Sequence, residues 1–426
     1  MGLGLCLFIT GVAWCQSNLQ PPDLFVPDAR SSAPFVVSRY SWFGAYYVRT
    51  TAYTAPFPGR WIVGVGLDED NSTLLVLSHS DGISVLAAVG PGGSVTTLYA
   101  STDRLITPPV PHQSGDMVAV KSNAGGLCRI RRDGSIVSTI AVISARLVEG
   151  VSYASADLDT GDYFVSTFWD SGNDILRITE RGLVTTLAGS SGGGWYGRIL
   201  PDYKNGDSVS LFSQPGVLFW ARLFMRPFRV LPIHQTPFSS VGDWGSAPAL
   251  FQSDWVVGMV SSYAIPTLPS VRVVSAFGGP FVDFPVTPAI GGGFLTVGTP
   301  EIVGRRKLAG RGPGNPGTIY ELLLSFPGEP NTLYHVGASL ALRPGLTLAN
   351  GAYIPLYPDA VFLRSLSDPL VFENFSGRLG SNARATARLR IPPIPGLRGL
   401  RLFLAAVTYD SSGVRTVSEP IGVTLQ

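Results

Sequence analysis

Short runs of alternating apolar and polar residues, separated by Gly-rich turns, follow one another along most of this chain. In residues 172–189, GNDILRITERGLVTTLAG, a polar turn, an apolar strand, a charged turn with glycine and a β-branched strand succeed one another. Alternation over four to eight residues is typical of half-buried strands, and glycine supplies the positive φ of tight turns. The pattern therefore predicts a protein built from short antiparallel strands.

A longer unit repeats along the first two thirds of the chain. Residues 149–189 are its best copy, and residues 62–100 and 106–141 match it. A spacing of roughly 40–50 residues with four strands in each unit is the signature of a propeller blade. The innermost strands are expected to begin near Ile62, Ile106, Gly150, Gly197, Ala247 and Pro285.

The last unit is incomplete, because it stops after the segment FLTVGTPEIV. Residues 34–54 precede the first unit and have no other assignment, so we expect them to share a sheet with residues 294–303. Strands from both ends would close the ring and remove its exposed edges. We predict a six-bladed β-propeller over residues 33–303; five or seven blades are the alternatives, since the fourth and fifth copies are degraded.

The quoted blade segments, with G-x-D, Y-V-S, G-N-D-I-L-R-I and G-x-V-T-T-L-A-G in succession, resemble NHL-type and virginiamycin-lyase-like propellers. The resemblance covers residues 33–303. It implies an architecture and hardly any chemistry, because one scaffold of this kind hosts many functions.

A second domain is expected after residues 304–318, whose Gly, Pro and Arg residues predict a linker. A basic docking patch for an anionic polymer is the alternative for this segment. The short alternating runs of residues 319–426 predict an antiparallel β-sandwich. Its segments PGLTLANGAYIPLYPD and AAVTYDSSGVRTVSEPIGVTLQ are similar to a C-terminal module of many uncharacterised secreted bacterial proteins, which implies an accessory or surface-attachment role and no activity.

Composition agrees with this all-β organisation. The chain is 45% apolar and 14% charged, with 50 Gly and 34 Pro, as expected for strands joined by Gly and Pro turns. A net charge of +2 provides no basic face of the kind that nucleic-acid binding needs. Residues 1–16 are apolar at first and then polar, which predicts a signal peptide, no transmembrane segment in the mature chain, and a secreted or cell-surface location; a buried N-terminal strand is the alternative.

The candidate site lies where loops enter the inner strands and where loops join the second and third strands, because these loops gather on one face around the propeller's central channel. Arginine, aromatic, acidic and amide residues fall in them. The candidate ligand-binding residues are Arg60, Trp61, Arg146, Glu149, Trp169, Asn173, Trp195, Tyr196, Asp243 and Trp244. Ring stacking and charged hydrogen bonds suit a polar or sugar-like ligand; alternatively, the rings pack and the arginines are solvated.

Chemistry beyond binding has weaker signals. Resemblance to lactonase-type propellers implies a divalent ion held by Glu149, Asn173 and either Asp202 or Asp243, since hard cations prefer oxygen ligands. Resemblance to the lyases implies a histidine, for which His79, His112 and His234 are available, although His112 is expected at the opposite end. The chain has no C-x-x-C or phosphate-binding motif, and its G-x-S-x-G match, GSSGG at residues 189–193, is expected to join two strands and not to open a helix, so no catalytic residue is assigned.

Two functions remain open from the sequence. The first is a secreted binding module that presents this face to a polysaccharide or protein partner and needs no cofactor. The second is a metal-assisted lyase or lactonase acting at the propeller mouth, with a divalent cation such as calcium.

Overall fold

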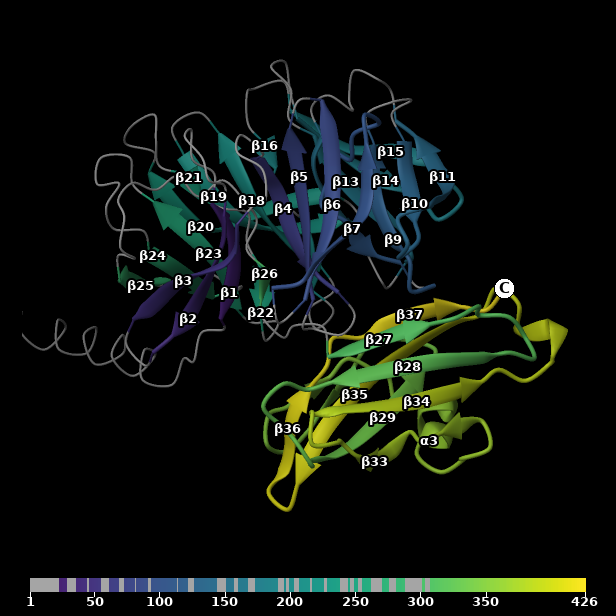
Figure 1. Cartoon of the computed structure of the whole chain (residues 1–426). Helices are drawn as coiled ribbons and strands as arrows, with labels where there is room; N and C mark the ends of the chain where they lie inside the picture. The colour runs from purple at the N-terminus through teal and green to yellow at the C-terminus, as the bar shows by residue number, and fades with distance from the viewer. Residues whose placement is uncertain are drawn as a thin grey trace, which may run out of the picture.

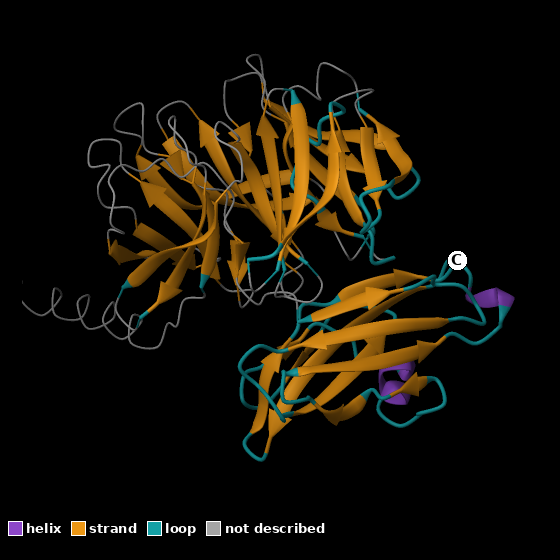
Figure 2. Cartoon of the chain, viewed as in Figure 1, coloured by secondary structure: helices purple, strands orange, loops and turns teal. Residues whose placement is uncertain are grey.

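The chain folds into β-sheets whose strands are antiparallel apart from the short parallel pairing of residues 286–287 with residues 47–48 (Figures 1 and 2). The computed structural model describes residues 23–28, 36–43, 46–54, 61–68, 73–80, 82–90, 93–112, 114–121, 126–143, 151–156, 160–167, 173–190, 195–196, 199–202, 207–214, 217–225, 228–237, 244–245, 249–251, 255–261, 270–275, 281–287, 301–302 and 307–426. None of the helices in these ranges is both long enough and apolar enough to cross a lipid bilayer.

Three four-stranded sheets follow the repeats of the sequence, each with its strands in chain order. The first consists of β4 (Trp61–Leu67), β5 (Leu74–Ser80), β6 (Ile83–Val89) and β7 (Val95–Ser101). The second consists of β8 (Val110–Pro111), β9 (Met117–Lys121), β10 (Gly126–Ile130) and β11 (Ile136–Val142). The third consists of β12 (Val151–Ala156), β13 (Tyr163–Thr167), β14 (Asn173–Ile178) and β15 (Val184–Ser190).

The next two sheets differ in that their first strand is in two pieces. In the fourth sheet, β16 (Trp195–Tyr196) and β17 (Leu200–Asp202) both pair with β18 (Asp207–Gln214), which is followed by β19 (Val217–Met225) and β20 (Phe228–Pro237). In the fifth, β21 (Trp244–Gly245) and β22 (Ala249–Phe251) both pair with β23 (Trp255–Ser261), followed by β24 (Ser270–Ser275) and β25 (Phe281–Thr287).

The last sheet is built from both ends of the propeller sequence. Its order is β26 (Glu301–Ile302), β1 (Leu24–Asp28), β2 (Val36–Trp42) and β3 (Tyr47–Thr54), and a short parallel pairing of β3 with β25 joins it to the fifth sheet. β1 pairs with β26, and β26 in turn contacts the innermost strands β4 and β22 of the sheets on either side. The predicted closure by strands from both ends is therefore confirmed, with β1 as an additional strand ahead of residue 33.

One predicted inner strand is wrong. Pro285 lies in β25, the fourth strand of its sheet, opposite Ser270 of β24, and β26 takes the inner position in the last sheet. Proline has no backbone N–H to donate, which suits it to an outer strand rather than to the centre of a sheet. The number of six blades stays a prediction, because residues 288–300 lie outside the described part of the chain.

The propeller core lies between neighbouring sheets. Val118 and Leu127 of the second sheet share one buried cluster with Val165 and Leu176 of the third. The last sheet packs on the first in the same way, through Val37 and Tyr53 against Val65 and Val76. The sequence repeats because each sheet buries its faces only against its neighbours, so every copy needs the same apolar positions.

Residues 307–426 form a β-sandwich with its own core. One sheet has the order β27 (Leu308–Arg311), β28 (Ile319–Ser325), β34 (Arg384–Arg390) and β32 (Phe372–Glu373). The other has the order β33 (Ser376–Arg378), β29 (Leu333–Ser339), β35 (Arg401–Asp410) and β36 (Gly413–Val417), with β37 (Ile421–Thr424) also paired to β35. The small pair β30 (Leu346–Thr347) and β31 (Tyr353–Ile354), helix α3 (Ala360–Ser365) and a 3-10 turn (Pro395–Leu397) complete the domain.

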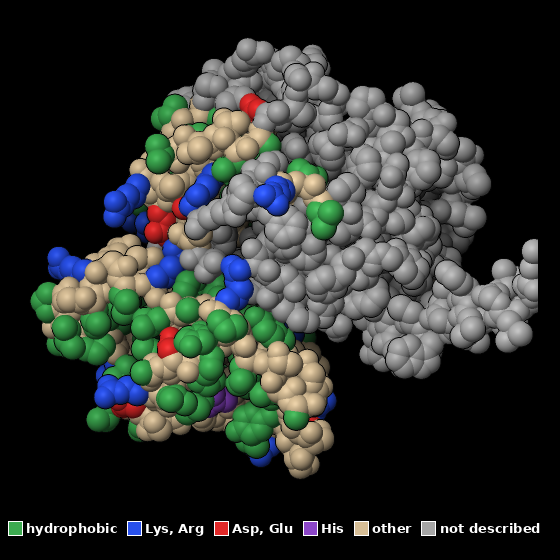
Figure 3. Space-filling model, turned by 180° about the vertical axis from the view of Figure 1, so that it is seen from behind, with side chains coloured by type: hydrophobic (Ala, Val, Ile, Leu, Met, Phe, Trp, Pro, Cys, Tyr) green, Lys and Arg blue, Asp and Glu red, His purple; other side chains and the backbone are tan. Residues whose placement is uncertain are grey.

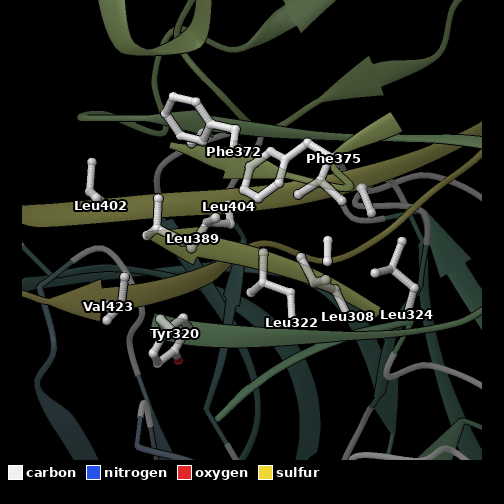
Figure 4. Packing of buried hydrophobic residues seen from close by; sticks show 14 of the residues in the cluster. Leu308, Tyr320, Leu322, Leu324, Phe372, Phe375, Leu389, Leu402, Leu404 and Val423 are labelled. Carbon is white, nitrogen blue, oxygen red and sulfur yellow. The ribbon is translucent and has the colours of Figure 1, made fainter. Parts of the chain in front are cut away.

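Leucine and aromatic side chains from both sheets meet between them (Figure 4). Leu322 of β28, Leu389 of β34 and Leu404 of β35 are all almost fully buried. The predicted linker, residues 304–318, is partly structured: β27 lies inside it and pairs with β28. Its Leu308 and Ala309 are buried, so burial of this short apolar pair outweighs the Gly and Pro content of the segment.

Candidate functional site

The backbone brings several of the candidate residues to one end of the propeller. Trp61 opens β4 opposite His79, at the end of β5. Trp195 of β16 lies opposite Ser213, and Trp244 of β21 lies opposite Ser261. In each of these sheets this is the end where the inner strand begins and the second strand finishes.

Asn173 reaches the same end by a different route. It is the first residue of β14, which follows the end of β13, and the end of β13 pairs with the start of β12. Tyr196 adjoins Trp195 in β16. Five predicted residues thus lie at one end of the ring: Trp61, Asn173, Trp195, Tyr196 and Trp244. This end is called the mouth below.

The other candidates, Arg60, Arg146, Glu149, Trp169 and Asp243, lie outside the described residues. For the five at the mouth, the structure describes the backbone. The strand register could be anticipated from the sequence, because each residue adjoins a turn at the same point of the repeat.

Two of the three candidate histidines lie at opposite ends of the propeller, and the third, His234, lies within β20 opposite Trp220. His79 is at the mouth, and its Nε2 donates to the carbonyl oxygen of Leu105 at 2.7 Å. His112 follows β8 at the opposite end, where its Nδ1 accepts from the backbone N–H of Ser114 at 3.1 Å. Burial lowers the pKa of His112 to about 4, with a further contribution from Arg129. Both rings therefore make structural hydrogen bonds.

Metal ligands do not gather in the part of the chain that the structure describes, where no group of three His, Cys, Asp or Glu residues is placed to hold an ion. Asp202 ends β17 opposite Asp207, at the end of its sheet away from the mouth. It therefore lies at the opposite end of the propeller from Asn173. Of the acidic residues predicted to share a metal ion with Asn173, Glu149 and Asp243 remain candidates.

Cys128 is buried within β10, and its thiol donates to the carbonyl oxygen of Ala119 at 3.3 Å. Burial raises the pKa of the thiol to about 11. A thiol that stays protonated is a poor nucleophile, so Cys128 behaves as a core residue.

A recurring ion pair at the end opposite the mouth was not anticipated. Asp116 precedes β9 and accepts from Nε of Arg129 in β10 at 2.5 Å. At the equivalent place in the next sheet, Asp162 precedes β13 and pairs with Arg177 in β14. The signal was present in the sequence, as a Gly-Asp before the second strand and an Arg-Ile at the end of the third.

The end opposite the mouth also contacts the C-terminal domain, which lies below the propeller in Figure 1. Arg401, the first residue of β35, places its guanidinium 3.6 Å from the Oε1 of Glu180, in the turn between β14 and β15. The mouth and the C-terminal domain are thus at opposite ends of the propeller.

Comparisons with known proteins give no family. No family model matches the chain, and no curated protein matches it. Similar solved structures include a protein of unknown function from Bacteroides caccae, which is 11% identical with a TM-score of 0.44 over 62% of this chain and 94% of the other. A putative TolB from Agrobacterium tumefaciens is 12% identical with a TM-score of 0.42, over 66% of this chain and 94% of the other.

The calcium-binding protein regucalcin from Agrobacterium tumefaciens is 13% identical, with a TM-score of 0.40 over 63% of this chain and 85% of the other. Likenesses at these TM-scores carry no argument about this chain. Its own strand order, its shared last sheet and its two-sheet C-terminal core make it a β-propeller followed by a β-sandwich.

Proposed function

We propose that this protein is an exported binding module whose propeller mouth recognises a polysaccharide, with the C-terminal sandwich as an accessory or surface-attachment domain. One observation supports the proposal above the others. Aromatic residues from three sheets begin strands at the mouth, while the C-terminal domain contacts the other end. The mouth is then available to a large ligand when the sandwich is attached elsewhere.

The residue types suit such a ligand. Trp61, Trp195 and Trp244 have broad apolar faces on which sugar rings stack, and indole N–H groups that donate hydrogen bonds to hydroxyl oxygens. Arg60 and Arg146, which are predicted to lie in the neighbouring loops, add charge-assisted hydrogen bonds to hydroxyl or carboxylate oxygens. Several such contacts, each modest, give a repeating polymer useful affinity through multivalency.

The experiment is a glycan array probed with the full chain, followed by calorimetry on the best polysaccharide. Trp195→Ala and Trp244→Ala are each expected to weaken binding about 5–30-fold, because a lost stacking contact costs about 1–2 kcal/mol. Tyr357→Ala is the matched control, since Tyr357 is an exposed aromatic residue of the C-terminal domain. It should leave the affinity unchanged.

The alternative function, a metal-assisted lyase or lactonase, would give the opposite result in these experiments. A chain that bound no glycan but opened a lactone or performed a lyase reaction, with the rate abolished in Glu149→Gln, would replace a binding role by an enzymatic one. Capture of a protein partner through the same tryptophans, without glycan binding, would show that the mouth is correct and the ligand class is wrong.

A further inference from the structure

Arg401 is an unusual residue for the start of a sandwich strand, because its long charged side chain is only 17% exposed. The guanidinium carbon lies 5.8 Å from the centre of the Phe403 ring. The carboxylate of Glu180, which belongs to the third propeller sheet, is 3.6 Å from the guanidinium. The largely buried charge of Arg401 therefore has its partner in the other domain, where the side chain of Glu180 remains 32% exposed.

Glycine makes room for this pair. Gly161, in the turn between β12 and β13, has a φ of +77°, and a Cβ at this position would lie 2.0 Å from Nη1 of Arg401. The same Cβ would lie 2.6 Å from Oε1 of Glu180. A side chain there would force the ends of the Arg401 and Glu180 side chains to shift, so glycine at residue 161 leaves room for the pair in its present position.

A second glycine repeats the arrangement one sheet earlier. Gly115, with a φ of +87°, precedes β9 as Gly161 precedes β13, and its Cβ would lie 3.2 Å from the carbonyl oxygen of Gly310 in β27. The turns before the second strands of two consecutive sheets therefore contact two different strands of the C-terminal domain, β27 and β35. Contacts at two separated points restrain rotation as well as translation.

Polar groups surround the junction. A cavity of about 240 Å³ lies between the domains, lined by Ser114, Arg129 and Arg131 on one side and by Gly312, Pro313 and Thr424 on the other. Figure 3 shows Lys and Arg side chains along this boundary. The junction is therefore a polar, charge-specific contact and not an apolar surface that would accept any neighbour.

The energetic argument follows from burial. Burial raises the pKa of Glu180, whereas Arg401 lowers it. Removing Glu180 leaves the more buried charge, that of Arg401, without its partner, which is the unfavourable case for an ion pair. When the domains separate, Arg401 and Glu180 lose each other and bind water instead. The ion pair therefore forms in one relative position of the two domains.

We propose that the propeller and the sandwich form one rigid unit, locked by Arg401 and Glu180 across the Gly115 and Gly161 turns. The C-terminal domain is then a fixed base at the end away from the mouth, and not a tethered module that swings around it. This inference concerns the domain arrangement and stands whether or not the mouth binds a polysaccharide.

Small-angle X-ray scattering of the full chain tests the proposal. The wild-type curve should fit one compact arrangement. Gly161→Leu and Arg401→Ala should each increase the radius of gyration and broaden the fitted ensemble, while circular dichroism shows that the sheets persist. Gly93→Leu is the matched control, because Gly93 also has a positive φ but a Cβ there would meet nothing within 4 Å.

Two further results test whether the Arg401–Glu180 pair holds the two domains together. Exchange of the charges, with Arg401→Glu and Glu180→Arg in one chain, should restore the compact curve that either single reversal loses. A wild-type curve that already needs a wide ensemble of domain positions would overturn the proposal, as would Gly161→Leu and Arg401→Ala curves that superimpose on the wild type.

Discussion

At the scale of single residues, the Asp–Arg pairs before the second strands recur in two consecutive sheets of the propeller. The side chain of Asp162 is only 6% exposed, and Arg177 pairs with it. A carboxylate buried to this degree needs a cation or several hydrogen bonds, because its transfer out of water costs several kcal/mol. The pair fixes the turn before β13 to the third strand of the same sheet.

Replacing Arg177 by methionine is expected to destabilise the propeller by about 2–4 kcal/mol, because Asp162 loses its partner while it stays buried. Denaturant unfolding, followed by tryptophan fluorescence, measures the change. Arg181→Met on the neighbouring exposed turn serves as the control and should cost no more than about 0.5 kcal/mol. Equal midpoints for the two variants would show that the ion pair contributes nothing.

At the scale of strands and turns, glycine explains how successive sheets stack. Gly134, in the turn between β10 and β11, has a φ of +85°, and its Cβ would fall 1.4 Å from the carbonyl oxygen of Leu98 in β7. Gly182 repeats this one sheet later, with a φ of +83° and the carbonyl oxygen of Ile140 at 2.2 Å. Each of these turns rests directly on the backbone of the preceding outer strand.

Gly182→Ala should therefore destabilise the chain more than Gly93→Ala. Both variants place a side chain at positive φ, which costs about 1–2 kcal/mol, and Gly182→Ala adds a backbone clash worth about 1–3 kcal/mol. Thermal melting of the two variants under identical conditions gives the comparison. If both melt at the same temperature, the turn is not a stacking contact.

At the scale of the whole molecule, the sequence predicts the repeat and the closure by strands from both ends of the propeller, but not which strands make the closing pair. The repeat predicts inner strands that start near Ile62 and Gly150, and these strands begin at Trp61 and Val151. It does not reveal that Pro285 ends up in an outer strand or that residues 24–28 pair with Glu301–Ile302. The same limit applies to the mouth, because the relative positions of side chains in five loops depend on the closed ring and not on any one repeat.

Acid should destabilise the folded chain between about pH 6.5 and pH 4. Burial and the neighbouring Arg129 and Arg401 lower the pKa of His112 to about 4. Asp116 raises this pKa, but by less than the other groups lower it. The unfolded chain therefore takes up a proton at a higher pH than the folded chain, so stability present above pH 6.5 is lost as the pH falls. His335 acts in the same direction, because burial also lowers its pKa.

Glu180 opposes this trend, because its raised pKa makes proton uptake favour the folded state. His112→Asn keeps a hydrogen-bond acceptor for the N–H of Ser114 but removes the titrating group. Midpoints of urea unfolding measured from pH 7.5 to pH 4 should fall less steeply for this variant than for the wild type. Parallel curves would show that His112 does not carry the acid sensitivity.

The pairing of β1 with β26 also governs the order in which the chain assembles as it is synthesised. Residues 24–54 leave the ribosome well before β26, the strand that pairs with β1, which follows about 250 residues later. Until then, the edge of β1 is unsatisfied and open to self-association. The C-terminal sandwich has no such wait, because its described strands all come from one continuous stretch, residues 307–426.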